Sequence, residues 1–108
     1  MQEYTFSKTD GADISETKAR EWMKRYRDAH PAKTDVIARF IGTDIVQRIL
    51  AQDKCVGLRV YFGYDETGQI QIFLCGSRAD GSNIWPDAAG SPAILADSTL
   101  ACPPYCPK

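Results

Sequence analysis

The chain has 108 residues, 44% hydrophobic and 25% charged, a composition typical of one globular domain that can bury its own core. Thirteen Lys and Arg against fourteen Asp and Glu give a formal net charge of −1, which argues against nucleic-acid binding and against attachment to an anionic membrane. The N-terminal residues lack the basic and apolar regions of a secretory signal, and no apolar run reaches transmembrane length, so we expect a cytoplasmic protein.

Residues 1–14 form an arm or a short strand, because Tyr4 and Phe6 alternate with polar residues before a Gly-containing loop. A helical part follows over residues 15–54. Its first helix runs from about Ser15 to Ala29, begins at an N-cap provided by Asp13 or Ser15, and ends before Pro31. The helical spacing gives it one apolar stripe, made of Ala19, Trp22, Met23 and Tyr26.

Residues 34–50 predict two short helices, or one kinked helix. The first would be capped by Thr34 or Asp35 and would end at Gly42. The second would be capped by Thr43 or Asp44, and its apolar face consists of Ile45, Val46, Ile49 and Leu50.

Residues 55–86 predict an antiparallel hairpin or meander. The turn spans Asp65–Gly68, with Gly68 in a left-handed conformation, and a third strand is expected at Asn83–Trp85. The alternation of side chains assigns a core face to Leu58, Val60, Phe62, Tyr64, Ile70, Ile72 and Leu74. The second face carries Arg59, Tyr61, Phe73 and Cys75.

Residues 87–108 predict an irregular Pro-rich tail held on the domain by Ile94, Leu95 and Leu100. The fold class is therefore α+β, as a single two-layer domain over residues 1–108 in which N-terminal helices pack on a small antiparallel sheet. The predicted core consists of Trp22, Tyr26, Phe40, Ile45, Ile49, Leu58, Val60, Phe62, Ile72 and Leu74.

Four cysteines raise the question of a metal site. Zinc prefers four N or S ligands from tight pairs, and Cys102 and Cys106 are one residue wider apart than the commonest pair. The prolines between and after them also lack the N–H groups that such sites use. Cys55 and Cys75 could complete a four-thiolate set, so zinc is an alternative, while the main expectation is that no cofactor is bound.

A disulfide is the second interpretation of the ending Cys102–Cys106. Four steps of polyproline II would separate the two Cα atoms by roughly 12 Å, beyond the roughly 7 Å that a bridge allows. A bridge would therefore need a turn or a cis peptide bond before proline. We favour a stiff tail whose Tyr105 packs on the domain and whose cysteines are small apolar groups, and a Pro-x-x-Pro docking peptide is a further alternative.

Three blocks of the sequence resemble a family of small uncharacterised bacterial proteins. They are a first helix with Trp22 and Tyr26, the Gly-Leu-Arg-hydrophobic-Tyr-Phe hairpin at residues 57–62, and the Cys-Pro-Pro-aromatic-Cys ending at residues 102–106. The resemblance covers about residues 20 to 107. It implies no activity, cofactor or partner, and it therefore adds no site residue.

The sequence holds no catalytic motif, so we expect a non-enzymatic binding or protein-interaction module, with an unknown protein or a second copy as partner in a homodimer. The candidate ligand or interface residues are Arg59, Tyr61, Phe73 and Tyr105. The sheet face that carries Arg59, Tyr61 and Phe73 could be the floor of a ligand site, a dimer interface, or a surface covered by the C-terminal segment. The alternatives are a thiol- or zinc-centred function at Cys102 and Cys106, and a small enzyme around Arg59, Tyr61 and Tyr64.

Overall fold

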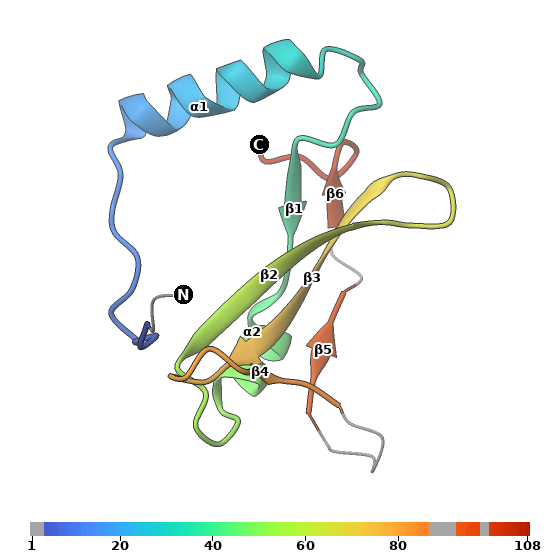
Figure 1. Ribbon diagram of the computed structural model, residues 1–108. Coiled ribbons are helices and arrows are strands. Elements are labelled where there is room, and N and C mark those ends of the chain that lie inside the picture. Colours follow the sequence, from blue (N-terminus) through green and yellow to red (C-terminus); the bar gives the residue numbers. More distant parts are fainter. Residues whose placement is uncertain (1–3, 87–92, 98–99) are drawn as a thin grey trace. The chain divides into compact units, whose positions relative to one another are not determined.

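The computed structural model describes residues 4–86, 93–97 and 100–108 (Figure 1). Its helices and antiparallel strand pairs confirm the α+β class. The chain forms two compact units, residues 1–10 with 41–99 and residues 11–40 with 100–108, and each is described by itself. The single domain over residues 1–108 stays a prediction. No helix in the described ranges is long and apolar enough to cross a membrane.

Helix α1 (Glu16–Ala29) belongs to the unit of residues 11–40 and 100–108. The Ser15 side chain accepts a hydrogen bond from the Lys18 amide, and the chain leaves the helix at His30, which confirms the predicted start and end. No residue of α1 is buried, and Trp22 and Tyr26 are 53% and 40% exposed. Their assignment to the core was therefore wrong.

Strand β1 (Ala38–Phe40) stands where a short helix was expected, and that prediction was wrong. β1 pairs antiparallel with β6 (Leu100–Cys102), with Arg39 opposite Ala101. The preceding residues, Val36 and Ile37, are β-branched and suit an extended chain as well as a helical face. The partner strand lies some 60 residues away in the sequence, so a local pattern could not reveal the pairing.

Helix α2 (Thr43–Leu50) confirms the second short helix, although Gly42, rather than Thr43 or Asp44, occupies its N-cap. Ile49 on this helix is fully buried and packs with Leu74 and Ala96. Three partly buried residues surround this cluster: Ile41, Ile45 and Ile94. This cluster is the core of the unit of residues 1–10 and 41–99.

Strands β2 (Gly57–Tyr64) and β3 (Ile70–Ser77) form the predicted hairpin (Figure 1). Their register sets Tyr61 opposite Phe73. Gly68 has a φ of +82°, a left-handed conformation that glycine adopts without strain. β4 (Asn83–Ile84) pairs with β3 at Gly76 and Ser77, which confirms the third strand.

Strand β5 (Leu95–Ala96) also pairs with β3, placing Ala96 opposite Leu74 and Leu95 opposite Cys75. The tail of residues 87–108 was expected to be irregular, and this prediction was wrong for the residues that form β5 and β6. The remaining part of that prediction at residues 87–92 and 98–99 lies outside the described residues. The apolar anchors of the tail are what allow it to add strands to the sheets.

The predicted core face of the hairpin is only partly covered. Leu74 is buried and Ile72 is half-buried, whereas Val60 and Phe62 on β2 are exposed. The reason is length: α2 has eight residues and spans about 12 Å, whereas an eight-residue strand spans about 26 Å. A helix this short covers one end of the hairpin, the end near β4 (Figure 1).

Candidate ligand-binding face

The second face of the hairpin carries the candidate site, and we call it the aromatic face. Strand alternation and register place Arg59 opposite Cys75 and Tyr61 opposite Phe73 on this face. Trp85 follows β4 and joins them, and Leu95 reaches the same face because β5 pairs with Cys75. Four separate segments of chain therefore meet here.

A chain of hydrogen bonds fixes one end of the aromatic face. The Arg59 guanidinium donates to the carbonyl oxygen of Gly81 at 2.9 Å and to Asn83 Oδ1 at 2.6 Å. Asn83 Nδ2 in turn donates to the Tyr61 hydroxyl at 2.6 Å. The guanidinium also lies over the Phe6 ring, 5.1 Å from its centre. These contacts fix the Arg59 side chain, and Arg59 in turn positions Tyr61 through Asn83.

Three aromatic rings form the floor of the face. Tyr61 stacks on Phe73 with 5.1 Å between ring centres. Trp85 meets both rings edge-on, at 6.1 Å from Tyr61 and 5.9 Å from Phe73. Stacked and edge-to-face geometries are the favourable ones for aromatic pairs, so the rings hold one another in place.

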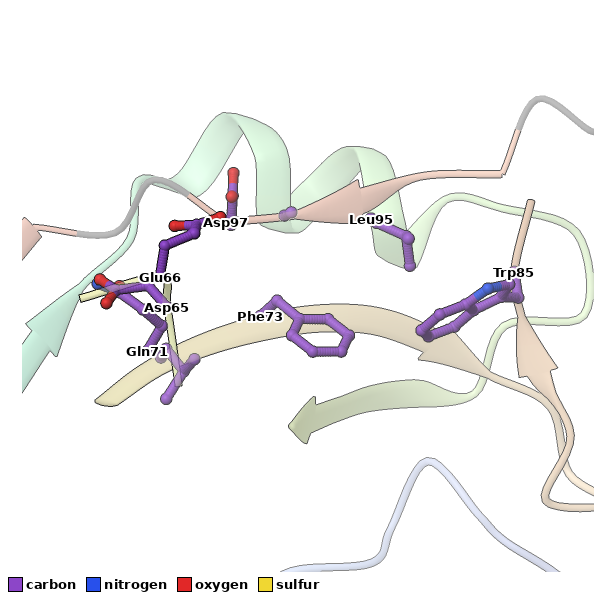
Figure 2. A pocket seen from close by; sticks show the side chains of 9 residues that line it. Asp65, Glu66, Gln71, Phe73, Trp85, Leu95 and Asp97 are labelled. Carbon is purple, nitrogen blue, oxygen red and sulfur yellow. The ribbon is translucent and has the colours of Figure 1, made fainter. Parts of the chain in front are cut away.

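A cavity of about 670 Å³ opens on this floor (Figure 2). Phe73, Trp85 and Leu95 form its apolar part, and the carboxylates of Asp65, Glu66 and Asp97 lie toward the other end. The other lining residues are Gln71, Ile72 and Ala96. The site therefore has an apolar end and an acidic end.

Asp65 supplies a fixed negative charge at the acidic end. Its Oδ1 accepts hydrogen bonds from the Thr67 hydroxyl and from the amides of Thr67 and Gln69, and its Oδ2 accepts one from Gln71. The Thr67 hydroxyl and the Gln71 amide contribute most to lowering the pKa of Asp65 from its usual 3.8 to about 2. Asp65 is thus both the organiser of the hairpin turn and a permanently ionised group near neutral pH.

We predict that Asp65→Asn lowers stability at neutral pH, because the new amide would set its own donor against Gln71 Nε2. The folded-state pKa is depressed, so the wild-type carboxylate stabilises the fold above about pH 3.8, and this contribution is lost as the pH falls through about 2. Urea unfolding of both proteins should show the difference at neutral pH and its disappearance in acid. The exposed Asp53→Asn serves as the control, and a difference that persists unchanged at low pH would contradict the prediction.

The structure brings together three of the four predicted site residues. Arg59, Tyr61 and Phe73 share the aromatic face, but only Phe73 lines the large cavity. Arg59 lines a smaller cavity of about 260 Å³. Tyr105 belongs to the other unit and is exposed, with its amide bonded to the carbonyl oxygen of Ala101.

Sequence reasoning missed Trp85, Leu95 and the three acidic residues of the cavity. Trp85 was noted only as part of a short strand, and Leu95 only as an anchor of the tail. Ile94 and Leu95, an apolar pair within a segment rich in Gly, Pro and Ala, were the signal that could have indicated β5.

The cysteines at the end of the chain form a disulfide, contrary to the expected free thiols. Cys102 and Cys106 are joined, with their Cα atoms 4.6 Å apart. The extended geometry assumed for this segment does not apply, because the bonds before Pro103 and Pro104 are both cis and the segment turns back on itself. Cys55 and Cys75 are free and buried. Among the described residues, no three His, Cys, Asp or Glu side chains gather as metal ligands.

We predict that alkylation of the unfolded protein without reductant modifies Cys55 and Cys75 and leaves Cys102 and Cys106 unmodified. In the folded protein Cys75 should react slowly, because burial is the main cause that raises the pKa of its thiol. Peptide mass spectrometry before and after reduction makes the measurement. Modification of all four cysteines without reduction would show that the disulfide is absent.

The residues proposed for a small enzyme do not gather in one place. Tyr64 is exposed on the face opposite to Arg59 and Tyr61, as the strand alternation requires. The side chain of Arg59 is already committed to Gly81 and Asn83. The three residues therefore do not form one reaction site.

Comparison of the chain with protein-family models, with curated proteins and with solved structures finds no match in any of the three.

Proposed function

We propose that this protein is a non-enzymatic binding module that holds a small ligand, or a side chain of a partner, in the cavity of the aromatic face. The observation that carries the proposal is the cavity itself, of about 670 Å³, with Phe73 and Trp85 at its apolar end. Small-molecule sites commonly measure about 300–1,000 Å³ and combine apolar walls with a few polar groups. The lining has this composition.

The floor of the cavity is pre-organised. Phe73, which lines the cavity, stacks on Tyr61 and meets Trp85 edge-on, and Tyr61 is itself held by Asn83. A rigid floor supports binding because a ligand then loses less affinity to the ordering of side chains.

Ligand-observed NMR with a library of neutral and charged small molecules tests the proposal. We expect compounds that bind the wild type to lose about tenfold in affinity with Trp85→Ala, since an aromatic contact is removed. The matched control is Phe62→Ala, which removes an exposed aromatic ring from the opposite face. Absence of any binder, or binders that respond to Phe62→Ala and not to Trp85→Ala, would contradict the proposal.

A homodimer is a second candidate, and it is supported by the position of β2 at the edge of its sheet. In the described residues β2 pairs only with β3. On the face opposite to the aromatic face, β2 exposes Val60, Phe62 and Tyr64. Two copies of one edge strand can pair antiparallel about a two-fold axis. Val60→Lys should then abolish a dimer seen by analytical ultracentrifugation, and a wild-type monomer at all concentrations would exclude it.

The remaining expectations stay predictions: a cytoplasmic location, and no nucleic-acid or membrane partner. A thiol- or zinc-centred function at Cys102 and Cys106 would first require reduction of their disulfide. The family resemblance also stays a prediction.

A further inference from the structure

The lining of the large cavity carries charge of only one sign. Asp65, Glu66 and Asp97 contribute carboxylates, and none of the nine lining residues, all within the described ranges, is Lys, Arg or His. The whole chain has a net charge of only −1, so this is a local feature. The smaller cavity differs, because its lining includes Lys8 and Arg59 as well as Asp10.

We infer that the ligand of the large cavity is an organic cation, an ammonium or guanidinium group on an apolar or aromatic stem. This inference rests on the proposed function and names the chemistry of its ligand. The stem would lie against Phe73, Trp85 and Leu95, and the cationic head would point toward the carboxylates at the other end (Figure 2).

The apolar end suits such a stem. Trp85 is 42% exposed and Leu95 is 41% exposed, so both side chains leave apolar surface for a ligand to cover. A tryptophan ring is also the best aromatic partner for a cation, through the electron density of its face. A cationic ligand can therefore gain energy at this end as well.

The acidic end suits an organic head group better than a divalent metal ion. Both carboxylate oxygens of Asp65 already accept hydrogen bonds within the turn, so Asp65 contributes charge more readily than a coordination bond. Calcium would need six to eight oxygen ligands in its first shell. An ammonium or guanidinium group needs only nearby negative charge and a few acceptors. Anions would be repelled by the same three carboxylates.

The test uses three probes of similar size and different charge: 2-phenylethylamine, 2-phenylethanol and phenylacetate. The chain has two tryptophans, so Trp22→Phe leaves Trp85 in the cavity as the single tryptophan, whose fluorescence can be excited selectively. We expect the amine to bind about tenfold more tightly than the alcohol, from its combined cation–π and charge contributions, and phenylacetate to bind most weakly. Added salt should lower the affinity for the amine and leave the affinity for the alcohol unchanged.

Variants then assign the effect to the acidic end. Glu66→Gln and Asp97→Asn should each lower the affinity of the amine by about threefold and leave the alcohol unaffected. Asp53→Asn, an exposed acid outside the lining, is the matched control and should change neither. Asp65 is left intact because it organises the turn. Circular dichroism and thermal unfolding confirm that each variant is folded.

A second arm distinguishes the source of the cation. A blocked tripeptide with Lys between two Ala residues is compared with the free amine, and the tighter binder identifies a partner side chain or a small molecule. Equal or tighter binding of the alcohol or of phenylacetate at Trp85 would overturn the cation inference and leave the proposed function standing. Failure of every probe, together with failure of the library screen, would overturn both.

Discussion

Replacing Ile49 by Ala should lower the free energy of unfolding by about 3 kcal/mol, the largest effect that we expect from one substitution. Ile49 is fully buried between Leu74 of β3 and Ala96 of β5, so its side chain joins the helix to two strands. Removing it leaves a cavity that a small core cannot easily close. Urea unfolding followed by circular dichroism measures the change.

The neighbouring Leu50 provides the control. Leu50 lies in the same helix but is 44% exposed, so Leu50→Ala should cost less than about 1 kcal/mol. Comparable losses in the two variants would show that α2 does not pack on β3 as described.

Replacing Arg59 by Met should lower stability by about 2 kcal/mol and loosen the floor of the cavity. The variant keeps the apolar stem but leaves the carbonyl oxygen of Gly81 and Asn83 Oδ1 without their donor. Asn83 then holds Tyr61 less firmly, and Tyr61 supports Phe73. We therefore expect weaker ligand binding although Arg59 does not line that cavity.

Arg25→Met, an exposed substitution on α1, is the matched control and should change neither stability nor binding appreciably. Unfolding curves give the stability, and NMR line widths of the Tyr61 and Phe73 rings report the mobility of the floor. An Arg59→Met protein with wild-type stability and sharp, unshifted ring signals would refute the positioning role.

Local patterns in the sequence were enough for the elements that depend on neighbouring residues. The spacing of Trp22 and Tyr26 predicted α1, the Ile45–Ile49 pair predicted α2, and the alternation around Gly68 predicted the hairpin. The pairing of β1 with β6 and of β5 with β3 joins segments that are distant in the sequence. A local pattern carries no information about such partners.

The residues of the candidate site also fall into those that a local pattern predicts and those that only distant strand pairing brings in. Alternation along β2 and β3 placed Arg59, Tyr61 and Phe73 on one face from the sequence alone. Leu95 and Asp97 join that face only through β5, and Trp85 through β4, so the cavity was not predicted. The disulfide was missed for a different reason, namely that the segment between its cysteines was assumed to be extended.

¹H–¹⁵N NMR of the labelled protein during titration with 2-phenylethylamine shows whether the aromatic face binds a ligand. The two tryptophans each give one indole N–H signal, and they belong to different units of the chain, Trp22 on α1 and Trp85 at the cavity. We predict that the signals of Trp85, Phe73 and Leu95 shift progressively while those of Trp22 and Phe62 stay in place. Shifts confined to Phe62 and its neighbours on β2, or no shifts at all, would show that the aromatic face does not bind the amine.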